Sequence, residues 1–382
     1  MSSSTFCVMP FIGTQFNATG LLTPCCRYNT DDINFESWDY SNFNNWWNVE
    51  LQPLRNDLLN GVKHSRCQNC WRDEELGIRS YRQMINAELP DLTGITQQTT
   101  YPTYQFYGLG NFCNLKCIMC SPALSSSIET EYFLNEEKYN KIGRHWIGDI
   151  EAKWYRSPTF LKLREQLTEY ADTIHLTGGE PLLTPDYIAL LEQIPDPTKV
   201  QVIVITNGTK IDDHVFELLT RFKHVQLMIS IEGTGSLNEY IRYGSSWSQT
   251  VANIERAKSA GFYVAIAHTF QRTSLYSFVD LAKFANSTGL KLITNFMSSP
   301  EELTIDSATD EEKTKFVGRL NELDYIDPEK FVSAGLKDIA KAVQDSVYDS
   351  ELDRKFWQYI DMLDNIRKTK FRDIFILDKT GQ

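Results

Sequence analysis

From Tyr104 onward the chain alternates short β-rich runs with segments of helical periodicity, and this alternation constrains the fold more than any other feature. The expected strands are Tyr104–Leu109, Thr173–Thr177, Val200–Thr206, Val225–Ile231, Phe262–Thr269 and Leu290–Phe296. The expected helices between them are Tyr187–Ile194, Asp213–Phe222, Trp247–Ser259 and Phe278–Ser287. Such repeats predict an α/β fold with a parallel sheet and right-handed crossovers. Six units fit a partial (βα)6 barrel, with a flat doubly wound sheet as the alternative, and either places the chemistry at the carboxyl ends of the strands.

Composition and patterning divide the chain into four parts. Residues 1–88 are expected to form a small module with a hairpin around Asn17–Gly20 and a helix over Trp71–Glu88. Residues 89–103 are polar and contain flanking prolines, which is typical of a linker. The barrel is then expected over 104–306, and a charged, helical C-terminal extension over 307–382.

The charge balance disfavours a nucleic-acid partner. The 382 residues include 38 Lys and Arg against 50 Asp and Glu, a formal net charge of −12, whereas binding to DNA or RNA depends mainly on cationic side chains that neutralise phosphates. The first residues lack the cationic and apolar regions of a signal peptide. No apolar stretch approaches the roughly 20 residues that a membrane span needs. The sequence therefore predicts a cytoplasmic protein with no membrane partner.

The eight cysteines fall into two groups, and the last 262 residues contain none. Close clusters of this kind are more typical of metal sites than of disulfides. The second group, Cys113, Cys117 and Cys120, has the spacing CxxxCxxC directly after the first expected barrel strand. Three thiolates can hold three irons of a cubane cluster and leave the fourth iron open to a small molecule, whereas four cysteines close the cluster. The alternative is a zinc knuckle with a distant fourth ligand.

The segment Cys-Asn-Leu-Lys-Cys-Ile-Met-Cys after a strand resembles the motif of the radical S-adenosylmethionine (SAM) superfamily. A second mark of that family, Thr-Gly-Gly-Glu-Pro, closes the next expected strand. Glycines let the backbone approach a ligand closely, and the resemblance assigns Gly178, Gly179 and Glu180 to the amino group of SAM. Taken alone, this segment is also compatible with an ordinary turn at a strand end.

Three further residues match the family over roughly 104–300, and a fourth residue, Met119, departs from its pattern. Asn207 lies in Ile-Thr-Asn-Gly-Thr at the end of the third strand, and Ser230 closes the fourth, where the family often places a hydroxyl on the SAM ribose. Arg242 matches an arginine that pairs with the SAM carboxylate, since a planar guanidinium suits bidentate binding. The structural alternatives are a buried strand serine and a solvated helix arginine. Met119 stands where an aromatic residue is common, and its thioether can pack against adenine.

The resemblance implies an enzyme, an oxidoreductase or a bond-forming enzyme, that uses SAM, a [4Fe–4S] cluster and an electron donor such as flavodoxin or ferredoxin. Cleavage of SAM would give a 5′-deoxyadenosyl radical that abstracts hydrogen from a peptide or small-metabolite substrate. The alternatives are a glycyl-radical enzyme activase and, in another class, a non-catalytic zinc-binding scaffold. The sequence identifies no catalytic side chain. His175, His268 and Asn295 are candidates to point into the barrel, although such residues are more often core groups.

The N-terminal cysteines, in the order C…GxxxxC…CxxC, resemble the twitch or SPASM module, which adds an auxiliary Fe–S cluster to some radical SAM enzymes. That module usually follows the barrel, whereas here it precedes it. A full SPASM module has seven cysteines for two clusters, so the five here allow one. The expected ligands of a second [4Fe–4S] cluster are Cys7, Cys25, Cys67 and Cys70, with Cys26 as an alternate. A Cys₄ zinc site is the other interpretation.

Overall fold

A computed structural model describes residues 4–30, 39–75, 77, 79–89, 91, 95–146 and 153–375. The chain divides into two compact units. The first unit comprises Met1–Asn111, Asp149–Ile205 and Asp212–Gln226. The second comprises Phe112–Gly148, Thr206–Ile211 and Leu227–Gln382.

The strands form one open sheet in the order β2-β1-β3-β4-β5-β6-β7-β8-β9. Strand β1 pairs antiparallel with β2, and parallel pairing joins β1 to β3, β3 to β4, β4 to β5, β7 to β8 and β8 to β9. The α/β class and the unclosed parallel sheet are therefore confirmed. The strands are β1 (Gly13–Phe16), β2 (Leu22–Thr23), β3 (Tyr104–Gly108), β4 (Thr173–Thr177), β5 (Gln201–Thr206), β6 (His224–Ser230), β7 (Tyr263–Phe270), β8 (Lys291–Phe296) and β9 (Phe331–Val332).

The six expected strands are β3 to β8, and each of their ends lies within one residue of its expected position. The physical reason is visible in β5, where Val202 and Val204 are fully buried while Gln201, Ile203 and Ile205 are only partly buried. One face of the strand is thus packed and the other is more open. This alternation, together with β-branched residues, makes a strand recognisable in sequence.

Helices occupy the connections between the strands, as a parallel sheet requires. Helix α12 has the expected bounds, whereas α13 begins four residues earlier than Phe278, at Ser274. The helices are α6 (Ser126–Leu134), α7 (Glu136–Lys141), α8 (Pro158–Thr168), α9 (Pro185–Glu192), α10 (Asp213–Leu219), α11 (Gly235–Ile241), α12 (Trp247–Ser259) and α13 (Ser274–Thr288).

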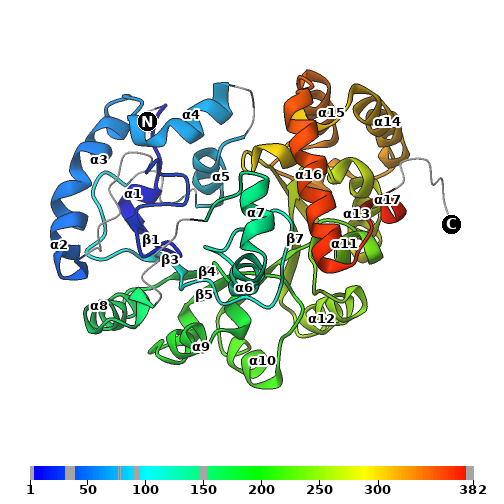
Figure 1. Cartoon of the computed structure of the whole chain (residues 1–382). Coiled ribbons are helices and arrows are strands. Elements are labelled where there is room, and N and C mark those ends of the chain that lie inside the picture. The colour runs from blue at the N-terminus through cyan, green and yellow to red at the C-terminus, as the bar shows by residue number, and fades with distance from the viewer. Residues whose placement is uncertain are drawn as a thin grey trace. The chain divides into compact units, whose positions relative to one another are not determined.

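The N-terminal segment contributes a strand to the sheet as well as its own helices. The expected hairpin is present, with Gln15 paired to Thr23. Strand β1 also pairs with β3, and Phe16 stacks on Tyr107 with ring centroids 5.5 Å apart. The boundaries of the four expected parts remain predictions. In Figure 1 the N-terminal helices, in blue, gather around β1; they are α1 (Met9–Ile12), α2 (Phe43–Asn45), α3 (Gln52–Leu59), α4 (Gln68–Glu75) and α5 (Tyr81–Glu88).

The expectation of one helix over Trp71–Glu88 is wrong, because α4 ends at Glu75 and α5 begins at Tyr81. Gly77 has a φ of 75°, a left-handed conformation that glycine adopts easily. Ser80 then caps α5: its hydroxyl accepts a hydrogen bond from the Gln83 N–H, and the Gln83 side chain accepts one from the Ser80 N–H. This capping box starts a new helix. Residues 76 and 78 lie outside the described part of the chain.

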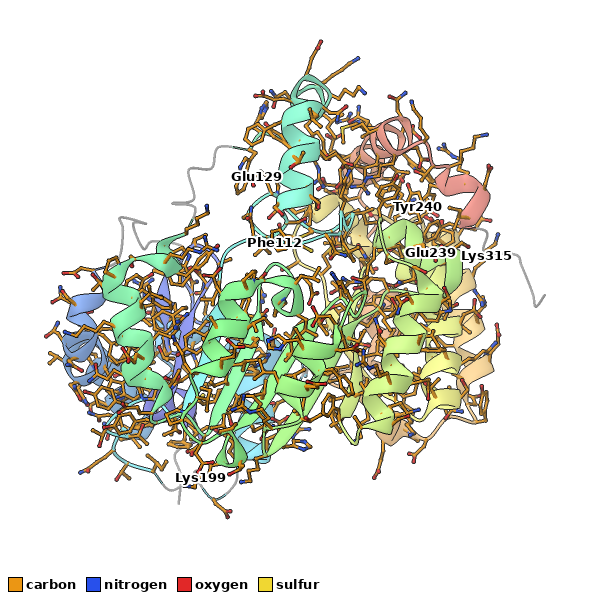
Figure 2. All side chains as sticks on the ribbon, turned by 90° about the horizontal axis from the view of Figure 1, so that it is seen from below. Phe112, Glu129, Lys199, Glu239, Tyr240 and Lys315 are labelled. Carbon is orange, nitrogen blue, oxygen red and sulfur yellow. The ribbon has the colours of Figure 1, made fainter. Side chains whose placement is uncertain are left out.

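The expected helical C-terminal extension is confirmed. An apolar core joins it to the rest of the second unit, and within that core Tyr240, labelled in Figure 2, packs against Phe371 with ring centroids 5.6 Å apart. Within the described ranges, no helix is both long and apolar enough to cross a membrane. The helices of the extension are α14 (Asp310–Leu320), α15 (Leu336–Asp345), α16 (Ser350–Arg367) and α17 (Phe371–Ile374).

Candidate functional site

The loop that carries Cys113, Cys117 and Cys120 lies in the second unit and is held by backbone hydrogen bonds. The Lys116 N–H donates to the Tyr243 carbonyl and the Ile118 N–H to the Ile241 carbonyl, both at 2.9 Å. These two bonds align the loop with the segment that follows α11. The loop therefore has a fixed backbone, although it contains no helix or strand.

Hydrogen-bond donors face two of the three sulfurs. The Leu115 N–H lies 3.5 Å from the Cys113 Sγ, and the Asn207 Nδ2 lies 4.0 Å from it. The Arg242 Nη1 lies 3.6 Å from the Cys117 Sγ. Burial raises the pKa of Cys117, and it raises that of Cys120 to about 12. Donors of this kind stabilise thiolates that ligate a metal and tune an iron–sulfur cluster.

Arg242 is mostly buried, and it lies beside a carboxylate that the sequence analysis missed. Its Nη2 lies 2.6 Å from the Glu232 Oε1, and Glu232 is fully buried. The other oxygen of Glu232 accepts a hydrogen bond from the Thr269 N–H at 2.9 Å and lies 3.7 Å from the His268 Nε2. Burial lowers the pKa of His268 to about 4, so its ring is neutral at pH 7. Arg242 is thus no solvated helix arginine, and its Nε has no hydrogen-bond partner among the described residues.

Helix α16 of the C-terminal extension anchors the cysteine loop through a hydrogen bond and an ion pair. The Tyr359 hydroxyl on α16 donates to the Ile118 carbonyl at 2.8 Å. Arg367, at the end of the same helix, pairs with buried Glu131 at 2.8 Å, and Glu131 also lies 3.2 Å from the Lys116 Nζ. Burial alone would raise the pKa of Glu131, but the hydrogen bonds and charge of Arg367 lower it below its ordinary value. Glu131 therefore joins the loop to α16 as an ionised group.

Removing Arg367 should destabilise the second unit strongly. We expect Arg367→Met to lower the free energy of unfolding by about 3–5 kcal/mol, because it leaves the Glu131 carboxylate buried with Lys116 as its remaining cation. Arg354→Met on the same helix is the matched control, since Arg354 pairs with Glu351 in solvent and its loss should change the free energy of unfolding little. Urea denaturation measures both. Equal midpoints for the two variants would contradict the anchoring role.

The segment Gly178–Glu180 lies in the first unit, directly after β4. Gly178 and Gly179 have φ values of 81° and 50°, and a Cβ on Gly178 would lie 3.3 Å from the Cα of Gly108. Both positions therefore favour glycine. The Glu180 carboxylate is buried and accepts a hydrogen bond from the Leu182 N–H at 3.1 Å, which caps the short helix Pro181–Leu183.

Three other expected cofactor contacts belong to the second unit. The Asn207 side chain donates to the Asn114 Oδ1 at 2.8 Å, which links the end of β5 to the cysteine loop. Ser230 is partly buried at the end of β6. Met119 is partly buried and packs against the apolar core that contains Ile118. The roles assigned to these residues remain predictions.

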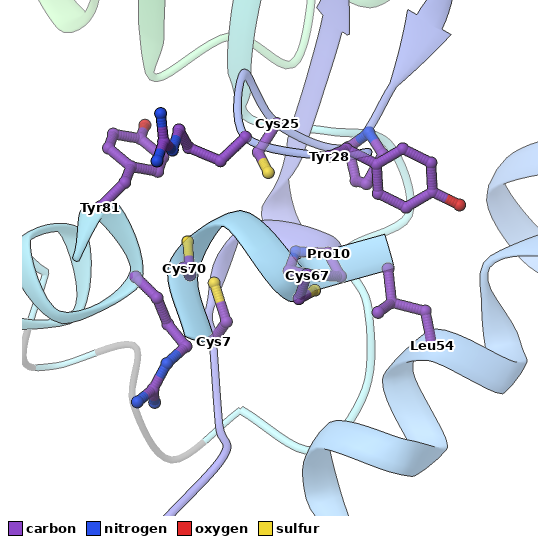
Figure 3. Close-up of a pocket in the computed structure, with 11 residues that line it drawn as sticks. Cys7, Pro10, Cys25, Tyr28, Leu54, Cys67, Cys70 and Tyr81 are labelled. Carbon is purple, nitrogen blue, oxygen red and sulfur yellow. The ribbon is translucent and has the colours of Figure 1, made fainter. Parts of the chain in front are cut away.

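The N-terminal cysteines surround a pocket in the first unit (Figure 3). Four of them line it, while Cys26 is exposed and does not. The space between these side chains is partly open to solvent. Burial raises the pKa of Cys67 to about 12. Across the described ranges, no three His, Cys, Asp or Glu side chains are grouped as a single metal ion requires. The lining residues are Cys7, Pro10, Pro24, Cys25, Arg27, Tyr28, Leu54, Cys67, Cys70, Tyr81 and Arg82.

Two sets of hydrogen bonds position these cysteines. The Phe6 carbonyl, next to Cys7, accepts a bond from the Arg82 Nη1 at 2.7 Å. The segment after Cys25 is tied to α4, because the Arg27 guanidinium pairs with Asp73 at 2.6 Å. On α4, the Asn69 side chain donates a hydrogen bond to the Arg27 carbonyl at 3.2 Å.

Most of the other polar and aromatic side chains considered for the site belong to the core or the surface. His268 is buried beside Ser274, with its Nε2 3.1 Å from the hydroxyl, and Asn295 is exposed on β8. Trp46 and Trp47 are buried in the N-terminal core, and Trp38 lies outside the described residues. His175 differs, because both of its ring nitrogens are buried without a hydrogen-bond partner among the described residues.

Comparison with known proteins gives a match to a family model and a set of distant relatives. A sequence model of the radical SAM superfamily matches residues 107–285. An AdoMet-dependent heme synthase of Methanosarcina barkeri is 24% identical over 179 residues, which are 46% of this chain and 45% of that protein. A GTP 3′,8-cyclase of Synechocystis is 24% identical over 176 residues, 45% of this chain and 47% of the relative. The chain thus matches about half the length of these relatives.

Solved structures with a similar arrangement include two proteins. The native anSMEcpe with bound AdoMet is 16% identical over 58% of each chain, with a TM-score of 0.38. SuiB of Streptococcus suis is 12% identical over 84% of this chain and 70% of its own, also with a TM-score of 0.38.

Proposed function

Since residues 107–285 belong to the radical SAM superfamily, we propose that this chain cleaves SAM reductively and uses the 5′-deoxyadenosyl radical to abstract hydrogen from a peptide or small metabolite. A [4Fe–4S] cluster supplies the electron for this cleavage when bound. The observation that carries the proposal is the loop of Cys113, Cys117 and Cys120, where hydrogen-bond donors already face two sulfurs. Three thiolates and no fourth suit a cluster with one open iron.

The chain's own residues have three tasks in this proposal. The three cysteines hold the cluster, and Asn207 and Arg242 stabilise the charge on their sulfurs through the contacts described above. Gly178 and Gly179 give the backbone the close approach that binding of the SAM amino group needs. Glu232 holds the Arg242 guanidinium in place, which leaves the Nε free for an acceptor such as the SAM carboxylate.

The direct test is anaerobic reconstitution with iron and sulfide, reduction with dithionite, and measurement of 5′-deoxyadenosine. SAM should be cleaved even without substrate, since this abortive reaction needs only the open iron and an electron. A protein that takes up one zinc and no iron, and forms no deoxyadenosine, would instead be a zinc-binding scaffold.

Arg242 should contribute to SAM affinity beyond its contact with the Cys117 sulfur. Losing one charge-assisted hydrogen bond costs about 1.5–3 kcal/mol, which weakens binding about 10- to 150-fold. Because Arg242→Ala alone would strand the buried Glu232 carboxylate, the informative variant combines it with Glu232→Gln. Calorimetry with SAM compares this double variant with Arg221→Ala, an exposed arginine elsewhere. Unchanged affinity would make Arg242 a structural residue only.

We also propose that Cys7, Cys25, Cys67 and Cys70 hold an auxiliary [4Fe–4S] cluster. What supports this is that all four line one pocket while the exposed Cys26 does not. The nearby guanidinium groups of Arg27 and Arg82 would favour the negative charge of a thiolate-ligated cluster. Four cysteines leave such a cluster closed, which suits electron transfer.

A further inference from the structure

One row of side chains across the sheet of the first unit combines unpartnered polar atoms with an aromatic stack. In the register of the parallel strands, Gln15 of β1 pairs with Phe106 of β3, Phe106 pairs with His175 of β4, and His175 pairs with Ile203 of β5. Paired residues of neighbouring strands project from the same face of a sheet. Figure 1 labels these four strands in the first unit.

Three polar side-chain atoms of this row have no hydrogen-bond partners among the described residues. These atoms are the Oε1 of Gln15 and both ring nitrogens of His175, and all three are buried. Buried polar groups are nearly always paired, and an unpaired one is costly. The His175 ring is held in place by stacking on Phe106, with centroids 4.6 Å apart and an interplanar angle of 28°. The row is therefore fixed in position while its hydrogen-bonding capacity is unused.

On strands β4 and β5 the face that carries the row is more open than the opposite face, whereas β3 is buried on both faces. On β4, Ile174 and Leu176 are fully buried, whereas Thr173, His175 and Thr177 are only partly buried. Strand β5 repeats this alternation. On this face the four strands carry no Asp, Glu, Lys or Arg; its residues are Gly13, Gln15, Tyr104, Phe106, Gly108, Thr173, His175, Thr177, Gln201, Ile203 and Ile205.

We propose that Gln15 and His175 bind an uncharged amide group of the substrate, which lies against the Phe106–His175 stack. A neutral imidazole offers one donor and one acceptor, and the Gln15 carbonyl offers a second acceptor. An amide supplies the complementary N–H donor and C=O acceptor. A carboxylate is disfavoured, because it brings only acceptors and a charge for which this face has no cation. His175 lies three residues before Gly178 in the chain. This inference therefore rests on the proposed function and deepens it by naming the substrate chemistry.

Burial lowers the pKa of His175 to about 4, which is consistent with a ring that stays neutral while it binds. The fold positions Gln15 through the pairing of β1 with β3. The N-terminal segment therefore contributes directly to the proposed subsite, and not only through its cysteines.

The test observes the ring nitrogens of His175 in full-length protein labelled with ¹⁵N-histidine. The chain has six histidines, and His175→Phe identifies the signal. N-acetylglycine methylamide should shift it saturably, whereas acetate should not. If the blocked peptide binds more tightly than acetamide, the site prefers a peptide amide. If the two bind with similar affinity, the site accepts any small amide. Gln15→Leu should weaken the response about 5- to 10-fold, and Gln166→Leu, an exposed position on α8, should leave it unchanged.

Two results would overturn the inference: a His175 signal that neither amide moves, or one that acetate moves equally. Thermal unfolding gives a second measure, because His175→Phe keeps the stack and removes two unpaired nitrogens. Its melting temperature should therefore equal or exceed that of the wild type, and a large decrease would mean that the nitrogens already have internal partners. The same preparations are assayed for 5′-deoxyadenosine. If the wild type forms no 5′-deoxyadenosine, the proposed function is refuted. If the wild type forms it but neither amide shifts the His175 signal, only the amide site is refuted.

Discussion

Replacing Cys113, Cys117 and Cys120 together by alanine should abolish formation of 5′-deoxyadenosine from SAM. The three sulfurs are the expected protein ligands of the cluster with an open iron, so their removal leaves SAM without the iron that binds it. We expect product at the level of a reaction without enzyme, measured by chromatography after anaerobic reduction. The loop itself should persist, because its anchoring bonds come from the Lys116 and Ile118 backbone and from Tyr359.

Cys26→Ala is the matched control for this experiment. Cys26 is exposed and does not line the N-terminal pocket, so its loss should change neither iron content nor deoxyadenosine output. Undiminished cleavage by the triple variant would refute the assignment of the loop.

The triple variant should nevertheless keep about four irons per chain, bound by the N-terminal cysteines. Adding Cys67→Ala and Cys70→Ala should remove this remaining iron, because it takes away half of the pocket's sulfurs. Iron analysis and the charge-transfer absorbance of the cluster measure the loss. In otherwise unaltered protein, the same two substitutions should spare abortive SAM cleavage, since the barrel cluster keeps its ligands.

The opposite result is equally clear. If the triple variant binds one equivalent of zinc and no iron after anaerobic reconstitution, the N-terminal module is a structural Cys₄ site. Retention of iron after loss of both Cys67 and Cys70 would mean that the ligands lie elsewhere.

Local patterns in the sequence predicted the barrel strands well. Strands such as β5 have alternating burial and β-branched residues, and both signals lie within the strand itself. The pairing of β1 with β3 was not predicted, because a four-residue strand gains its partner about 90 residues later in the chain. The break between α4 and α5 was missed although its signals, Gly77 and the Ser80–Gln83 capping box, are local.

The sequence predicted which residues belong to the candidate site, but not the hydrogen bonds and ion pairs that connect them. The spacing of Cys113, Cys117 and Cys120 required no tertiary information. Glu232 was missed because a carboxylate two residues after a strand end resembles any surface loop residue, and only burial beside Arg242 distinguishes it. The ring nitrogens of His175 have no partner in the described part of the chain because the neighbouring strands place no donor or acceptor beside them. A local sequence pattern does not report on such tertiary neighbours.

The anchor of the cysteine loop has a consequence for biosynthesis. The hydrogen bond from Tyr359 to Ile118 joins residues 241 positions apart, and Arg367 lies 236 positions after Glu131. A ribosome adds about 5–20 residues per second, so the loop leaves it at least about ten seconds before α16 is made. During that interval the three thiols lack their final support. Cluster insertion into a rigid loop thus has to follow the synthesis of α16. A protein truncated before α16 should accumulate without iron in this loop.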